Sequence, residues 1–256
     1  AKNNGIKVVQ VGEGADELFY GYDHWLRFIK LNRYIKPITK SGSNNFKFKG
    51  HRANLLSNIL LNRTSFAGGA LGFNVPEIED LLVSGITDDF ELISYVDNKW
   101  DEYFSNKNSK LTKWMTLIDL QIRLPELLLM RMDKLVMQSS IEARVPFLDH
   151  KLIEYILTIP EKIIFDKQNT KPLIKQVANK HIPKEIYNRT KQGFRAPVGE
   201  WIKKDQEYFY DSIRSFNSST NLFKSKSLEK IISGEDYQKK WYLSNLANWH
   251  LSRSTS

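Results

Sequence analysis

The alternation of apolar and polar residues predicts one short strand followed by a chain that is mainly helical. Residues 6–11 read Ile-Lys-Val-Val-Gln-Val, a β-branched run typical of a buried parallel strand. From residue 16 onwards, apolar residues recur at spacings of three and four, which indicates amphipathic helices. We therefore expect helices over residues 16–35, 51–63, 77–84, 88–104, 151–158, 170–180, 197–216 and 226–253.

The most apolar part of the chain covers residues 111–136, where Pro125 interrupts a long helical pattern. This pattern predicts central helices that are buried on several sides. Polar or glycine-rich segments at residues 41–45, 67–72 and 105–110 predict loops.

A glycine turn directly follows the predicted strand. Residues 12–22 read Gly-Glu-Gly-Ala-Asp-Glu-Leu-Phe-Tyr-Gly-Tyr. A strand, a glycine turn and a helix start would aim backbone N–H groups at one spot, and Glu13, Asp16 and Glu17 add three carboxylates there. Acids beside such amides indicate a metal ion or proton transfer, although they also serve as ordinary helix caps. The turn lacks the third glycine of a dinucleotide fingerprint and the Gly-Lys-Ser/Thr of a P-loop.

Two later segments also combine charge with glycine or proline. In residues 129–149, four charges (Arg131, Asp133, Glu142 and Arg144) lie in or beside an apolar helix, where we expect them to pair with one another or with neighbouring segments. Pro146 predicts an extended turn, and Asp149 a cap for the next helix. Residues 188–197 read Asn-Arg-Thr-Lys-Gln-Gly-Phe-Arg-Ala-Pro, which by chemistry alone is an exposed basic turn.

These segments together resemble the synthetase domain of the asparagine synthetase family. Residues 12–22 resemble its signature, residues 142–149 its Glu-Ala-Arg-Val-Pro-Phe-Leu-Asp run, and residues 188–197 its Arg-x-Lys-x-Gly-Phe-x-x-Pro loop. Residues 170–175 fit the helix that precedes this loop. The resemblance implies the C-terminal portion of an α/β synthetase domain of the adenine nucleotide α-hydrolase-like (PP-loop ATPase) kind, mainly α over residues 1–256, with one N-terminal parallel strand.

The resemblance also implies an activity with ATP and Mg²⁺. That family adenylates a carboxylate, by default aspartate, and transfers ammonia from a glutaminase domain to give an amide, AMP and pyrophosphate. Each matching position then carries an expected role. Glu13 is a general base or charge-positioning group, Gly12 and Gly14 let the backbone approach the nucleotide, Asp16 holds Mg²⁺, Lys191 stabilises the reacting phosphorus centre, and Arg189 is a weaker candidate that could be structural.

Departures from the family pattern affect two predictions: which substrate is used, and whether this sequence contains the whole enzyme. The Ser-Gly-Gly-x-Asp-Ser pyrophosphate loop and the glutaminase domain with its cysteine are not in this sequence. Val11 stands where many members have serine, and Tyr20 where they often have glycine. Relatives that use another carboxylate, from a sugar, a peptide or a β-lactam precursor, are therefore an alternative. A single predicted strand without partners further suggests a piece of a longer or split enzyme, inactive alone.

Amino-acid composition excludes several classes of protein. The chain has no cysteine, which excludes disulfides and thiolate chemistry, and it shows no signal peptide or membrane-spanning run. We expect a cytoplasmic protein without a membrane partner, and a homodimer is one assembly that we consider. A net charge of +9 leaves a non-catalytic basic helical module for nucleic acid or another anionic partner as the runner-up. The basic residues are scattered along the chain, so the catalytic interpretation is preferred and nucleic acid is not expected.

Overall fold

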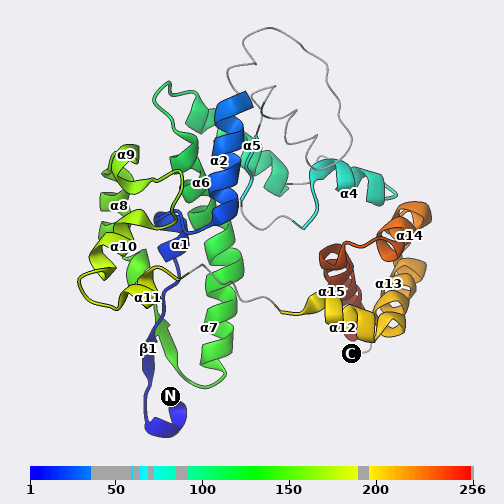
Figure 1. Cartoon of the computed structure of the whole chain (residues 1–256). Coiled ribbons are helices and arrows are strands. Elements are labelled where there is room, and N and C mark those ends of the chain that lie inside the picture. The colour runs from blue at the N-terminus through cyan, green and yellow to red at the C-terminus, as the bar shows by residue number, and fades with distance from the viewer. Residues whose placement is uncertain (36–58, 60–63, 69–71, 85–90, 190–195, 255–256) are drawn as a thin grey trace. The chain divides into compact units, whose positions relative to one another are not determined.

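The computed structural model describes residues 1–35, 59, 64–68, 72–84, 91–189 and 196–254 (Figure 1). The chain divides into two compact units. The first unit contains both strands and the helices α1 (Ala15–Leu18), α2 (Asp23–Ile35), most of α5 (Glu91–Phe104), α6 (Leu111–Ile118), α7 (Met130–Met137), α8 (His150–Thr158), α9 (Glu161–Ile164), α10 (Pro172–Ala178) and α11 (Lys184–Tyr187). The second unit contains α4 (Val75–Leu81), α12 (Val198–Lys204), α13 (Gln206–Thr220), α14 (Ser225–Ser233) and α15 (Tyr237–Ser254).

The predicted strand forms, and it has a partner. β1 (Val8–Gln10) pairs in parallel with β2 (Glu142–Arg144), with Val9 opposite Ala143. The Val11 N–H donates to the Arg144 carbonyl at 2.9 Å and extends the pairing by one residue. The expectation of a single strand without partners is therefore wrong. The pattern gave no signal for β2 because Glu-Ala-Arg contains no β-branched or aromatic residue, so tertiary pairing decides its conformation.

The expectation that the first strand is buried is also wrong. Val8 is 40% exposed and Ile6 is 46% exposed. Within the described residues the sheet has two strands, so β1 is paired along one edge only and neighbours cover little of its faces.

The helix predicted over residues 16–35 is split into α1 and α2. The chain turns between them at Tyr20, which has a left-handed backbone (φ 56°), and at Gly21, whose N–H donates to the Asp16 carbonyl at 2.8 Å. A left-handed residue ends a helix because its geometry cannot continue the ladder of hydrogen bonds. Tyr20 is 3% exposed, and its side chain fills the core.

Residues 111–137 form one continuous rod of three parts. α6 leads into a π-helical segment, Asp119–Leu129, which contains Pro125 and continues into α7. Burial decreases along the rod: Met115 in the first part is fully buried and Leu124 in the second is 2% exposed, whereas Leu135 in the third is 63% exposed. π-helical turns are rare and are often found at functional sites.

Other helix boundaries differ in detail from the predictions. The helix expected at 77–84 begins earlier, where Asn74 and Glu77 form a reciprocal capping box. Asp149 caps α8 as predicted, accepting from the Lys151 and Leu152 N–H groups, and Pro146 begins a short 3₁₀ turn (Pro146–Leu148) in place of an extended one. The expected helices 197–216 and 226–253 are each divided in two, as α12 and α13 and as α14 and α15. The predicted helix 51–63, apart from Ile59, and the caps Asp88 and Asp89 lie outside the described residues.

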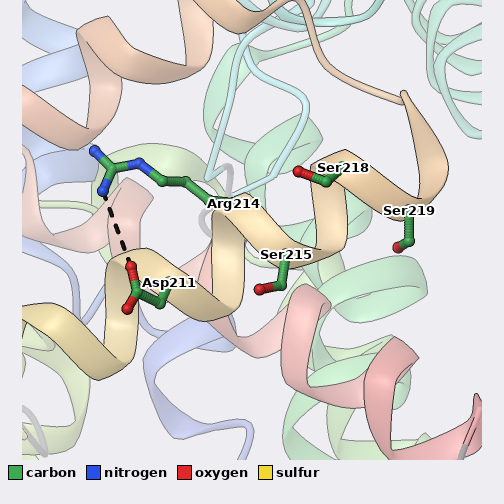
Figure 2. A pocket seen from close by; sticks show the side chains of 5 residues that line it. All are labelled: Asp211, Arg214, Ser215, Ser218 and Ser219. Carbon is green, nitrogen blue, oxygen red and sulfur yellow. Dashed lines mark ion pairs between the residues drawn. The ribbon is translucent and has the colours of Figure 1, made fainter.

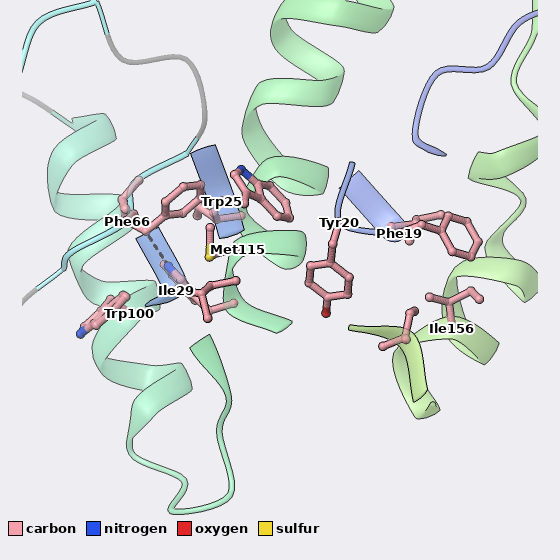
Figure 3. Close-up of a cluster of buried hydrophobic side chains, with 13 residues drawn as sticks. Phe19, Tyr20, Trp25, Ile29, Phe66, Trp100, Met115 and Ile156 are labelled. Carbon is pink, nitrogen blue, oxygen red and sulfur yellow. Dashed lines mark hydrogen bonds between the residues drawn. The ribbon is translucent and has the colours of Figure 1, made fainter. Parts of the chain in front are cut away.

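Aromatic side chains dominate the core of the first unit (Figure 3). The Trp114 indole N–H donates to the Phe66 carbonyl at 2.8 Å, and this bond is buried. Tyr20 packs edge-on against Phe165, with ring centroids 5.3 Å apart. These contacts join α6, the turn after α1 and the segment after α9 around one core, which holds the glycine turn against the rest of the unit.

The second unit has its own apolar core and forms around α13 and α15. Its buried residues include Ile213, Phe216, Leu228 and Leu243. An isolated antiparallel bridge joins Leu82 to Phe223 and ties α4 to this core. None of the described helices is both long and apolar enough to span a lipid bilayer.

The buried phenol of Tyr20 gives the fold a specific pH dependence. Burial raises the pKa of Tyr20 to about 12, above the value of about 10 in an unfolded chain. A raised folded-state pKa contributes stability in full below about pH 10, and this contribution is lost as the pH rises towards 12. Between about pH 9 and pH 12 we expect the wild type to lose about 1–3 kcal/mol more unfolding free energy than Tyr20→Phe, measured by urea denaturation. Tyr34→Phe, at a tyrosine that is 79% exposed, is the matched control and should behave as the wild type does; equal pH profiles for all three proteins would refute the assignment.

Candidate functional site

The glycine turn lies at the carboxyl end of β1, beside the carboxyl end of β2. Both strands end at the same edge because they run in parallel. Gly14 has a left-handed backbone (φ 89°), and a Cβ there would collide with Leu148. Phe19 packs edge-on against Phe147, with ring centroids 6.1 Å apart. The structure thus brings the first and second sequence segments together at one edge of the sheet.

The three carboxylates of the turn face different surroundings. Glu17 points inward and is 1% exposed, and it accepts a hydrogen bond from the Tyr22 hydroxyl. The Thr116 hydroxyl donates to the Glu17 carbonyl at 3.0 Å. Glu17 is therefore a buried structural acid, not a ligand that is open to a substrate.

Arg123 provides the positive charge that pairs with the buried Glu17 carboxylate. Its Nη1 lies 2.8 Å from Asp119 Oδ2 and 3.6 Å from Glu17 Oε1, and Asp119 is fully buried. The guanidinium also lies over the Tyr22 ring, 4.6 Å from its centroid. Burial and the Glu17 carboxylate raise the pKa of Tyr22 well above its usual range, so that it remains a neutral donor.

The π-helical segment explains how this cluster forms. Asp119 and Arg123 both belong to it, and Arg123, held by Asp119, reaches the Glu17 carboxylate. Sequence reasoning missed both residues. The signal that could have found them is an acid and an arginine four residues apart inside the most apolar stretch of the chain.

Asp16 points the other way, towards the start of α10. Its Oδ1 lies 2.7 Å from the Lys171 ammonium nitrogen, and both side chains are about one fifth exposed (18% and 24%). Lys171 was not among the predicted site residues, although it lies in the segment 170–175 that resembles the family. The structure therefore joins a fourth sequence segment to the glycine turn.

Glu13 and Gly12 complete the outer side of the turn. Glu13 is half-buried, and no hydrogen bond or ion pair within the described ranges engages its carboxylate. A Cβ at Gly12 would meet nothing within 4 Å, so packing inside the chain does not demand glycine there. A carboxylate beside open backbone is an arrangement that can accept a proton or position a charged substrate.

The donor set admits Mg²⁺ only together with a substrate. Among the residues that the structure describes, no group of three or more His, Asp or Glu side chains could hold a metal ion. Mg²⁺ usually keeps several waters and binds through one or two carboxylates plus substrate phosphates. Asp16 fits such partial ligation, provided that its ion pair with Lys171 opens.

The third predicted segment is only partly described. Lys191 lies outside the described residues, and Arg189, which follows α11, is exposed. The expected pairing of charges in residues 129–149 holds for Glu142 and Arg144, which meet at 2.9 Å on the surface. The expected burial is wrong, because Arg131 and Asp133 are exposed and solvent can satisfy their charges.

Two surface hollows among the described residues are lined by residues outside the glycine turn. One, of about 600 Å³, follows α13 and is lined by Asp211, Arg214, Ser215, Ser218 and Ser219 (Figure 2). Arg214 is held by Glu229 at 2.9 Å, and the lining comes from a single helix, so no groups converge on a ligand there. The other, of about 430 Å³, lies between α9 and α10 and contains Phe165, Asp166 and Pro172 among its lining residues.

A glycine turn that carries acids at the carboxyl edge of parallel strands is the type of place where α/β enzymes bind ligands. The sequence profile of asparagine synthase matches residues 1–251, and the chain belongs to that family. It is 25% identical over 260 residues to asparagine synthetase [glutamine-hydrolyzing] 1 of Bacillus subtilis, a match that covers 96% of this chain and 40% of that protein.

Other relatives are also named as asparagine synthetases. A putative asparagine synthetase [glutamine-hydrolyzing] of Mycobacterium tuberculosis is 24% identical over 261 residues, covering 96% of this chain and 39% of that protein. The human asparagine synthetase [glutamine-hydrolyzing] is 34% identical over 86 residues, which are 31% of this chain and 15% of that protein. The chain thus spans about two fifths of the length of the first two relatives. No solved structure matches it at comparable significance.

Removing the buried guanidinium tests the inward cluster. Arg123→Met leaves Glu17 and Asp119 buried without their cation, and we expect it to lower the free energy of unfolding by about 3–5 kcal/mol. The matched control is Arg33→Met, because Arg33 pairs with Glu161 at 3.0 Å but is 44% exposed, and about 1 kcal/mol or less is expected. Urea denaturation followed by tryptophan fluorescence measures both. Equal losses in the two variants would contradict the assignment of a buried charge cluster.

Proposed function

We propose that this chain is the adenylating part of an ATP-dependent amide-forming ligase, with aspartate as the default carboxylate. The substrate carboxylate attacks the α-phosphorus of ATP, which forms an acyl-adenylate and releases pyrophosphate. Ammonia then attacks the acyl carbon and displaces AMP, which leaves an amide. The observation that carries the proposal is the glycine turn at the carboxyl edge of β1, with Glu13 and Asp16 on its outer side, in a member of the asparagine synthase family.

Each outer residue has a role that its surroundings support. Gly12 leaves open space beside the backbone, which suits a closely approaching nucleotide. Glu13 can position the substrate or take a proton from the attacking amine, because no cation within the described residues neutralises it. Asp16 would hold Mg²⁺ on the phosphates, and the bound ion would supply charge neutralisation there.

Lys191 and Arg189 extend the proposal to the third segment. Lys191 would stabilise the charge that develops on the transferred phosphorus centre, as the resemblance implies. Arg189 would contribute to the nucleotide site from the adjacent, exposed position. The ammonia would come from a glutaminase domain, and the names of the relatives support this donor.

Residues 1–256 match only part of each relative named above. We propose that they do not catalyse adenylation by themselves, because they span about two fifths of the length of the relatives named above. A basic nucleic-acid-binding module is not favoured for a member of this family. A relative that uses a different carboxylate remains the second candidate, and it is supported by Val11, a half-buried residue directly after β1 where many members have serine.

Exchange of labelled pyrophosphate into ATP tests this proposal in the protein as its gene encodes it. We expect exchange that depends on added aspartate and Mg²⁺, and a loss of about a hundredfold or more in Lys191→Ala and, through the role of Glu13 in positioning the substrate, in Glu13→Gln. The matched controls are Glu102→Gln, at a glutamate that is 72% exposed, and Lys184→Ala, at an exposed lysine in α11; both should exchange normally. No exchange with any carboxylate in the wild type would overturn the proposed function. Exchange with another carboxylate but not with aspartate would favour the second candidate.

A further inference from the structure

The ion pair between Lys171 and Asp16 connects the start of α10 to the glycine turn. The two charged atoms are 2.7 Å apart, and both side chains remain partly open to solvent. Exposed ion pairs usually add little to the stability of a fold, and a pair that is mostly buried, as this one is, must also offset the desolvation of both charges. The chain nevertheless maintains this pair by two unusual features.

The first feature is the backbone of Lys171 itself. Its φ of 52° and ψ of 46° are left-handed, a conformation that a residue other than glycine seldom adopts. Pro172 follows directly, and a proline favours an extended residue before it. Such conformations persist only where the surroundings enforce them, and they concentrate at ligand sites.

The second feature is Gly21. A Cβ on this residue would collide with Asp16 Oδ1 and with Lys171 Cε. Its N–H also donates to the Asp16 carbonyl at 2.8 Å, which closes the turn after α1. Glycine at this position therefore provides the space in which the carboxylate and the ammonium meet.

Asp16 can pair with either of two cations, the Lys171 ammonium or a divalent metal ion. Glu17 is already committed to Arg123 and Tyr22 on the buried side. Asp16 is the carboxylate to which the proposed function gives Mg²⁺, and in the structure the Lys171 ammonium lies against it. A carboxylate with a resident ammonium can exchange that cation for another, because either cation is attracted by charge and both side chains of the pair are partly exposed.

We propose, building on the adenylating function above, that Lys171 is the resident counter-ion of Asp16. Asp16 would hold a Mg²⁺ ion that arrives with the nucleotide, and the ion would supply charge neutralisation there. Lys171, anchored by the strained start of α10, would then leave the carboxylate and contact the phosphate oxygens of the same nucleotide. Lys171 is in this way a nucleotide-binding residue that also keeps Asp16 neutralised while the site is free.

Metal binding without nucleotide tests the exchange directly. In the gene-encoded protein, binding of Mn²⁺ is followed by electron paramagnetic resonance as a probe of the divalent-cation site. Lys171→Met removes the competing ammonium and should strengthen Mn²⁺ binding about fivefold. The same variant should bind the Mg²⁺ complex of α,β-methylene-ATP at least about tenfold more weakly, because a charged contact to phosphate is lost. Adding Asp16→Asn to Lys171→Met should abolish the gain in Mn²⁺ binding that Lys171→Met produces.

The controls separate a specific role from loss of structure. Lys175→Met, one helical turn further along α10, should leave both affinities unchanged, and Lys171→Arg should keep the weak Mn²⁺ binding of the wild type. Lys171→Gln, which also removes the ammonium and leaves Asp16 unchanged, should match Lys171→Met and provides a second route should that variant fail to fold by circular dichroism. Unchanged or weaker Mn²⁺ binding in folded Lys171→Met would overturn the proposal, and so would a gain that survives Asp16→Asn. Since the Mn²⁺ measurement needs neither ATP nor turnover, its failure is distinct from an absence of pyrophosphate exchange.

Discussion

The buried carboxylate of Glu17 is the constraint on which the candidate site depends. An ionised acid that is 1% exposed is tolerated only where cations and donors surround it. Arg123 and the Tyr22 hydroxyl provide these partners, and fully buried Asp119 holds the guanidinium in place. The inward side of the turn is thereby fixed to the rod that α6 and the π-helical segment form.

This anchoring divides the acids of the turn into structural and chemical roles. Glu17 is buried in the core, whereas Glu13 and Asp16 are both partly exposed. A rigid turn that presents these two carboxylates can hold substrates in a defined geometry, and preorganised groups of this kind contribute most to catalysis when they do not move during the reaction. The parallel pairing of β1 and β2 adds a second constraint, because it sets the turn beside the loop that contains Leu148.

The sequence predicted the parts of this arrangement that depend on local chemistry. The β-branched run before Gly12 indicated β1, and Asp149 indicated the start of α8, because strand propensity and capping act over a few residues. It did not predict β2, whose residues Glu142–Arg144 take their conformation from pairing with a segment far away in the chain.

Long-range contacts also account for the missed site residues. The Arg123–Glu17 and Lys171–Asp16 pairs connect segments that are far apart in the sequence. Helical spacing predicts which residues share one face of a helix, but it does not predict which other segment that face will contact. The strained backbone of Lys171 was equally hidden, because a residue before proline is expected to be extended. The resemblance to the asparagine synthetase family supplied the roles of Glu13, Asp16 and Lys191, which residue chemistry alone had left open.

The most direct test of the central claim follows a single oxygen atom. Aspartate labelled with oxygen-18 in its side-chain carboxylate is supplied with ATP, Mg²⁺ and glutamine or ammonia to the protein as its gene encodes it. If the carboxylate attacks the α-phosphorus and an amine then displaces AMP, one label moves into the phosphate group of AMP. Recovery of that label in AMP, read by mass spectrometry, is the result that this account predicts. Amide formation with unlabelled AMP, or with the label in inorganic phosphate, would contradict it.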